Sequence, residues 1–249
     1  MRHPRSPAAV LLVLVLVAVV PSCGTSLPDT GGSTPPTTAS TAASPPSSGV
    51  QPSGSAAGES CEYVPGGVAS KPVDLPPTTG VRTSGAAAWV MKTNEGDVTL
   101  TMNRTKAPCT VNSFESLARQ GFFDDTTCHR LTDSGSIFIL QCGDPTGTST
   151  GGPGYTFADE TDGTESYTRG VVAMANAGPG TNSNGSQFFL IWQDSTGLDA
   201  TPNYTIFATM DTESINVIAR IAAEGQDGSN PAGGGTPNNP AEIISVKPR

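Results

Sequence analysis

The stretch AWVMKTNEGDVTLTM, residues 88–102, contains the pattern that decides the fold. Two short runs rich in apolar and β-branched residues, 88–93 and 98–102, flank the polar turn Asn94-Glu95-Gly96-Asp97. Short runs of this composition are typical of strands, and a brief glycine-containing turn between two of them predicts a β-hairpin. The same alternation of short apolar runs and turn signals continues through the rest of the chain.

Residues 85–249 as a whole have the pattern of one small β domain. Six further runs are expected to form strands, and they lie at residues 127–131, 137–141, 170–174, 187–191, 205–209 and 242–246. Two other segments, 108–121 and 211–225, carry apolar residues at helical spacing and end in glycine, which predicts two helices. We therefore predict a mainly β fold, a closed eight-stranded antiparallel β-barrel capped by two α-helices. Closure is expected because an open sheet would expose two unpaired edges.

The composition of the chain excludes several classes of protein. Its 249 residues include 29 Gly and 22 Pro, so an all-helical fold is excluded. With 13 Lys+Arg against 22 Asp+Glu and no basic run, we expect no binding to nucleic acid. One of the two histidines, His3, lies in a targeting segment, which leaves His129 alone without a metal-ligand motif. We therefore expect neither a metal nor a cofactor, and we interpret His129 as structural.

The N-terminal segment predicts export. Arg2 and Arg5 precede an uncharged apolar run, 8–20, which is too short to span a bilayer but suits a signal peptide at residues 1–22. The sequence Val20-Pro21-Ser22-Cys23 resembles a bacterial lipobox, so Cys23 is expected to be lipidated after cleavage, although Pro21 is atypical there. The alternative is ordinary signal cleavage. Either way we expect a protein outside the cell membrane, held at its outer face by lipid or secreted.

Two segments separate this signal from the domain. Residues 23–60 consist almost entirely of Gly, Ala, Ser, Thr and Pro, a composition that cannot bury enough apolar surface to offset the entropy of ordering, so we expect a disordered tether. Residues 61–84 are more mixed, and side chains such as Tyr63 and Val73 could pack, so we expect a partly ordered approach to the domain at 85–249.

Common catalytic templates do not match the domain, but two stretches are distinctive. No GxSxG elbow, P-loop or dinucleotide fingerprint occurs. The stretch CHRLTDSGSIFILQCGD, residues 128–144, places Arg130 and Gln141 on neighbouring strand segments beside Phe138. The stretch MANAGPGTNSNGSQFFLIW, residues 174–192, is a Gly- and Asn-rich loop that enters an apolar strand.

These two stretches resemble the two signature segments of the cyclophilin family of peptidyl-prolyl isomerases, in order and in spacing. The resemblance runs through HR…FILQCGDPTGTSTGGPGYTFADE (129–160) and MANAGPGTNSNGSQFF (174–189), covers residues 85–249, and is greatest to forms tethered outside Gram-positive cells. It implies the barrel with two capping helices, an isomerase activity on X-Pro bonds without a cofactor, and proline-containing polypeptides as partners. We expect a monomer that meets the membrane only through its lipid anchor.

The resemblance also implies a role for each matching residue. Arg130 would be the catalytic arginine, Phe138 an aromatic wall, and Gln141 the side chain that steadies both arginine and substrate. Asn176 would offer main-chain hydrogen bonds to an extended peptide. The remaining residues of the binding groove would be Ile139, Ala175, Ala177, Gln187, Phe189, Leu198 and Tyr204.

Four positions depart from the family pattern. Ile139 stands where Met is usual, Ser149 where Gly is usual, Gly197 where Trp is common, and Tyr204 where His is frequent. The exchange of Met for Ile139 keeps an apolar wall of similar volume. The departures lie in the groove and bear on peptide preference more than on chemistry.

Other functions stay open from the sequence. Taken singly, the groove residues are typical of a core, and Arg130 could pair with Asp133 at the surface. One alternative is a tethered proline-peptide-binding or chaperone-like module with little turnover, which Ser149 and Gly197 favour. Another is a structural envelope lipoprotein with an inert barrel. The presence of Arg130 together with Gln141 argues against both, because neither function needs a donor aimed at an amide nitrogen.

The remaining cysteines predict disulfides, since export brings the chain to an oxidising compartment. Cys61, Cys109, Cys128 and Cys142 allow three pairings. Cys128 and Cys142 flank two strands expected to pair as a hairpin, which favours Cys128 with Cys142 and Cys61 with Cys109.

Overall fold

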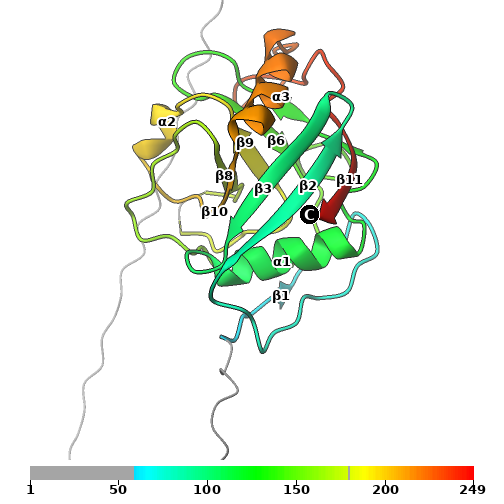
Figure 1. The fold of residues 1–249 in the computed structure, drawn as a ribbon, viewed down its shortest axis with the longest axis vertical. Coiled ribbons are helices and arrows are strands. Elements are labelled where there is room, and N and C mark those ends of the chain that lie inside the picture. Colours follow the sequence, from blue (N-terminus) through cyan, green and yellow to red (C-terminus); the bar gives the residue numbers. More distant parts are fainter. Residues whose placement is uncertain (1–58, 179) are drawn as a thin grey trace, which may run out of the picture. The chain divides into compact units, whose positions relative to one another are not determined.

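The structure is a computed structural model that describes residues 59–178 and 180–249 (Figure 1). The predicted signal peptide at 1–22, the lipidation of Cys23 and all but the end of the 23–60 tether lie outside the described residues. Within the described ranges, no helix combines the length and the hydropathy that a membrane span requires.

One antiparallel sheet of nine strands forms the body of the domain, in the order β4-β11-β2-β3-β10-β8-β9-β6-β5. Its strands are β2 (Ala86–Thr93), β3 (Gly96–Asn103), β4 (Thr126–Thr127), β5 (Arg130–Leu131), β6 (Ile139–Cys142), β8 (Val171–Met174), β9 (Phe188–Ile191), β10 (Ile206–Met210) and β11 (Glu242–Pro248). A separate pair joins β1 (Val64–Pro65) to β7 (Tyr155–Thr156).

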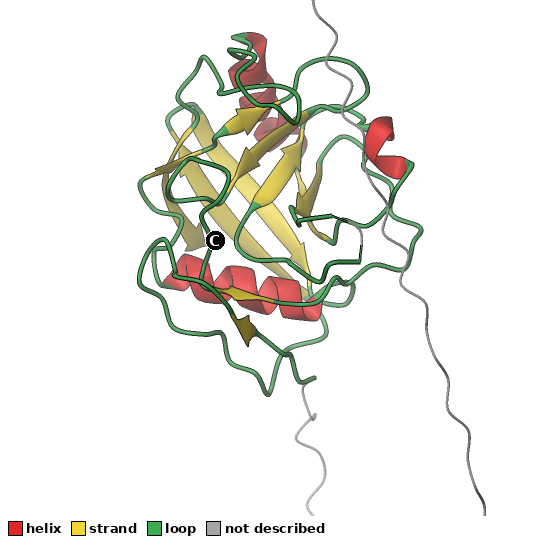
Figure 2. Cartoon of the chain, turned by 180° about the vertical axis from the view of Figure 1, so that it is seen from behind, coloured by secondary structure: helices red, strands yellow, loops and turns green. Residues whose placement is uncertain are grey.

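The two strands at the ends of this order are neighbours in the chain. Only Cys128 and His129 separate β4 from β5, and their main-chain N–H groups donate to Ala241 O and Gln141 O, each at 3.0 Å. The predicted strand 127–131 is therefore two short strands, because the segment changes partner from β11 to β6. The sheet curls round (Figure 2), an arrangement compatible with the predicted eight-stranded barrel. The mainly β fold is confirmed.

The hairpin predicted from residues 88–102 is confirmed. Strands β2 and β3 pair from Ala86↔Asn103 to Thr93↔Gly96, which leaves a two-residue loop. Gly96 has a φ of +134°, and a Cβ there would lie 3.2 Å from Val217 Cγ2. Glycine therefore lets this turn approach the C-terminal helix closely.

Both predicted helices form, and they lie at opposite ends of the sheet (Figures 1 and 2). Helix α1 (Pro108–Arg119) begins with Pro at its first turn, and the Glu160 carboxylate accepts hydrogen bonds from its first main-chain N–H groups at 2.8 and 2.9 Å. Helix α3 (Thr212–Ala223) is capped by Asp211, which accepts from Ser214 N at 2.8 Å. A third helix, α2 (Thr196–Asp199), is too short to show periodicity in the sequence.

Both favoured disulfides are present, Cys61–Cys109 and Cys128–Cys142. The first ties the segment 61–84, hereafter the strap, to α1. In Figure 1 the strap, drawn in cyan, runs past α1 and carries β1. The strap is thus fixed to the barrel by a covalent bond and by pairing of β1 with β7.

Candidate active site

Arg130 and Gln141 lie opposite each other on β5 and β6, and Gln141 in turn lies opposite Phe189 on β9. Directly paired residues share one face of a sheet. The residues next to them along each strand point the other way, since Leu131, Leu140 and Phe188 belong to the main core inside the barrel. The alternation therefore places Arg130, Gln141 and Phe189 together on the outer face.

Three hydrogen bonds hold the Arg130 guanidinium. Nη1 donates to Gln141 Oε1 at 3.1 Å, Nε to Gly233 O at 2.9 Å, and Nη2 to Ala232 O at 3.0 Å. Partial burial lowers the pKa of Arg130, but an arginine remains protonated at neutral pH. Since guanidinium carries five N–H donors, one hydrogen on each Nη has no partner among the described residues and is left for a ligand. The side chain is thus oriented and still able to donate.

A chain of amides continues from Arg130 across the site. Gln141 Nε2 donates to Gln187 Oε1 at 2.9 Å, and Gln187 Nε2 donates to the carbonyl oxygens of Ser149 at 3.1 Å and Gly151 at 3.0 Å. Each amide accepts on one side and donates on the other, so the chain fixes the direction of both. Gln141 therefore positions Arg130, as the resemblance implies.

An apolar cluster separate from the main core lies beside this polar chain. Its buried members are Ile139, Tyr167, Ala173, Phe189, Ile191 and Leu198, with Ala175 and Tyr204 packed against them. Phe138 is half-buried and packs edge to face on Trp192, with ring centroids 5.3 Å apart. Five of the predicted groove residues, Ile139, Ala175, Phe189, Leu198 and Tyr204, thus lie in or around this cluster. Phe138 packs on Trp192, and Ala177 is exposed.

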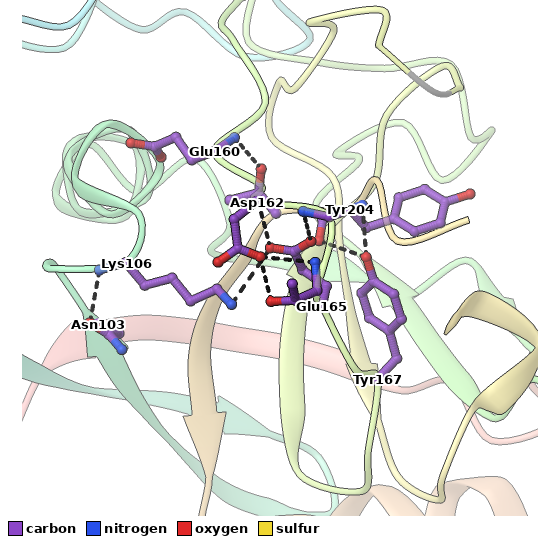
Figure 3. Close-up of polar contacts among 10 residues, drawn as sticks. Asn103, Lys106, Glu160, Asp162, Glu165, Tyr167 and Tyr204 are labelled. Carbon is purple, nitrogen blue, oxygen red and sulfur yellow. Dashed lines mark hydrogen bonds and ion pairs between the residues drawn. The ribbon is translucent and has the colours of Figure 1, made fainter. Parts of the chain in front are cut away.

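Tyr204, which stands where the family often has His, packs edge to face on Phe189 at 5.3 Å. Tyr167 holds it: the Tyr167 hydroxyl donates to Tyr204 O at 3.0 Å and accepts from Tyr204 N at 2.8 Å (Figure 3). Sequence reasoning missed Tyr167, because a single tyrosine in a loop gives no periodic signal.

The loop before Tyr167 is fixed by a buried carboxylate. Glu165 accepts hydrogen bonds from the main-chain N–H groups of Asp162 and Gly163 at 3.0 Å, and it pairs with Lys106 at 3.6 Å (Figure 3). A buried carboxylate is stabilised when it is both paired and hydrogen-bonded. These contacts fix the loop that carries Tyr167, and Tyr167 in turn holds Tyr204.

Asn176 uses its side chain within the protein. Its Nδ2 donates to Asn203 O at 2.9 Å and to Asp159 Oδ1 at 3.2 Å, and its Oδ1 accepts from Gly178 N at 3.1 Å. The side chain thus shapes the loop, and only the main chain could serve an extended peptide.

Two departures from the family pattern have a structural account. Ser149 has a φ of +68°, so its backbone keeps the left-handed conformation that glycine adopts freely. At Gly197 a Cβ would collide with Ser136 Oγ and lie 3.1 Å from Ser136 O, so a larger residue would require Ser136 and Ile137 to move.

His129 is buried, and neither ring nitrogen has a hydrogen-bond partner among the described residues. Burial lowers its pKa and outweighs the opposing effect of the Asp144 carboxylate, so the imidazole is neutral at neutral pH. A buried, neutral ring supports the structural interpretation of His129.

Comparisons with known proteins show the family of the chain. Residues 89–247 match the family model described as cyclophilin type peptidyl-prolyl cis-trans isomerase/CLD. The probable peptidyl-prolyl cis-trans isomerase B of Mycobacterium tuberculosis is 44% identical over 203 residues, covering 76% of this chain and 63% of that protein. The Mycobacterium leprae protein of the same name is 42% identical over 204 residues, covering 76% and 66%. The chain therefore spans less than two thirds of the length of these relatives.

Solved structures point the same way. The crystal structure of a cyclophilin type peptidyl-prolyl cis-trans isomerase of Cryptosporidium parvum matches with a TM-score of 0.56 and 28% identity, covering 66% of this chain and 98% of that one. A second crystal structure of that protein was determined in the presence of the dipeptide Ala-Pro. From the family match, the shared fold and the arrangement of Arg130, Gln141 and Phe189, we conclude that the chain belongs to the cyclophilin-type peptidyl-prolyl cis-trans isomerase family.

Proposed function

We propose that this protein accelerates cis-trans isomerisation of X-Pro peptide bonds. The observation that carries the proposal is the oriented Arg130 guanidinium, which keeps donors free on the outer face of the barrel directly beside an apolar cluster. A proline ring needs an apolar surface, and a twisted amide needs a donor at its nitrogen. The site offers both on one face of the sheet.

The chemistry requires few groups because no covalent bond breaks. Rotation about an X-Pro bond meets a barrier of roughly 18–20 kcal/mol from amide resonance, while its two end states differ by about 0.5–1 kcal/mol. In the twisted state the proline nitrogen regains a lone pair. Arg130 can donate to that lone pair but much less well to the planar amide, so the bond would stabilise the transition state selectively.

The apolar cluster would hold the proline ring while the other side of the peptide turns. Phe189 and Leu198 are buried in the cluster, and the half-buried Phe138, which precedes the cluster residue Ile139 in the chain, packs on Trp192. Contact with them binds both isomers similarly, so it positions the ring for either direction of rotation.

The clients we propose are proline-containing proteins outside the cell membrane, reached by a domain tethered through lipid on Cys23. The signal-like segment at 1–22, the lipobox-like Val20-Pro21-Ser22-Cys23 and the tether composition support this location. Replacing Cys23 with Ser should release the protein to the medium or leave it unprocessed, and equal membrane retention of both forms would contradict lipid anchoring.

A protease-coupled assay on short X-Pro peptides tests the activity. Arg130→Ala should lower kcat/KM at least tenfold, because it removes a transition-state contact. The substitution should cost little unfolding free energy, because the hydrogen bonds of Arg130 to Ala232 and Gly233 are exposed. Arg220→Ala, which removes an exposed arginine of α3 bonded to Glu95 O, is the matched control and should keep full activity. No turnover by the wild type would overturn the proposal, and wild-type turnover by Arg130→Ala would overturn the role given to Arg130.

A further inference from the structure

The strap approaches the loop beside the active site more closely than side chains would allow. Gly66 N donates to Gly154 O at 2.9 Å, and Ser70 N donates to Gly152 O at 2.8 Å. A Cβ on Gly154 would lie 3.0 Å from Ala69 N, and one on Gly151 would lie 2.6 Å from Ser70 Oγ. Glycines in the loop therefore make room for the strap to lie along it.

Several contacts fix the strap in this position. Besides the Cys61–Cys109 disulfide, Tyr63 packs edge to face on Tyr155 and Phe157, with centroids 5.5 and 5.7 Å apart. The Tyr63 hydroxyl donates to Cys109 O at 2.9 Å. Buried aromatic contacts of this kind stabilise beyond their buried area. The strap is therefore a firm wall, and it precedes the residues 89–247 that match the family model.

A cavity of about 470 Å³ lies beside the strap, and its lining includes the predicted groove residues Ala175, Asn176, Ala177 and Gln187. Gly66, Gly67 and Val68 of the strap line one side, and the other side includes Gln141 and Gln187 of the amide chain. Val68 is 94% exposed although it is apolar. None of the described residues that line the cavity carries a charge. The cavity thus extends from the amide chain of the site to the exposed side chain of Val68.

We propose that the strap adds a wall to this part of the peptide groove and so shapes a substrate subsite, in which Val68 contacts an uncharged side chain of the client a few residues from the proline. This rests on the proposed isomerase function. The volume is ample for one large side chain, and an uncharged lining cannot compensate the loss of water around a charged one. An apolar side chain would instead gain from covering Val68.

Charge placed on the strap tests the subsite. The substrates are X-Pro peptides that are varied at one position at a time. The varied positions lie on either side of the proline within reach of the cavity, and each carries Leu, Lys or Glu. A short X-Pro peptide is the reference substrate. For each protein, kcat/KM for a varied peptide is divided by kcat/KM for this reference peptide. Wild type should favour Leu at one position. Val68→Asp should raise Lys over Glu at that position by about fivefold, the effect of one partly screened charge.

Val64→Asp is the matched control, because Val64 lies on the same strap, is 51% exposed and does not line the cavity. It should change the Lys-to-Glu ratio less than twofold. Equal effects of the two variants, or no preference for Leu at any position, would overturn the subsite. Those results are distinct from failure of the isomerase proposal, which would show as no turnover of the short peptide by wild type.

Discussion

Breaking the Cys61–Cys109 disulfide should destabilise the whole domain. The bond closes a loop with a sequence separation of 48. In the chain-entropy account, a cross-link of this size lowers the free energy of the folded state relative to the unfolded state by about 4 kcal/mol. The double variant Cys61→Ser with Cys109→Ser should therefore lose about 4 kcal/mol of unfolding free energy.

Urea denaturation of the full chain measures this loss. With a denaturant slope of about 2 kcal/mol per molar, the midpoint should fall by about 2 M. Each single variant opens the same loop, so both should shift the midpoint as far as the double variant does. A shift below about 0.5 M would refute the reasoning, because it would mean that the strap leaves the barrel before the barrel unfolds.

Three further changes have expected outcomes. Gln141→Met keeps the volume but removes the bond to Arg130, so kcat/KM on a short X-Pro peptide should fall about tenfold with an unchanged urea midpoint; full activity would contradict the positioning role. Ser149→Gly should raise the unfolding free energy by about 0.5 kcal/mol. The reason is that glycine relieves the left-handed backbone strain of the folded state by more than it increases the entropy of the unfolded chain. A lower urea midpoint would refute this. Because the pKa of His129 is lowered in the folded state, the unfolded chain takes up a proton first as pH falls below about 6.5. Wild type should therefore lose unfolding free energy between pH 7.5 and 5.5 relative to His129→Leu. The same pH dependence of unfolding free energy in both proteins would contradict this.

The sequence predicted those parts of the fold that repeat a pattern over several residues. The hairpin of residues 88–102 and both long helices show this, because period and turn chemistry act locally. The split of 127–131 into two strands could not be predicted, since it depends on which distant strands lie on either side. β1 and β7 have two residues each, too few to show any period.

The site was predictable where side chains carry the chemistry. The resemblance implied that Gln141 steadies Arg130, and the two side chains share a hydrogen bond. Gln187 was expected only as a groove residue, and its hydrogen bond to Gln141 was not predicted. The two other acceptors for Arg130 are main-chain carbonyls of Ala232 and Gly233. Every residue has such a carbonyl, so no residue type marks them. The wall formed by the strap was likewise hidden, because glycines line it and contribute backbone alone.

Nuclear magnetic resonance exchange on an Ala-Pro peptide tests the central claim most directly, because it observes rotation about the bond and separates turnover from binding. Uncatalysed exchange between the cis and trans signals takes tens to hundreds of seconds. A catalytic amount of the full chain should bring this exchange to a rate visible as cross-peaks, and Arg130→Ala should remove most of that rate. Shifts of the peptide signals that show binding, without any gain in exchange, would contradict the isomerase and favour a proline-binding module with little turnover.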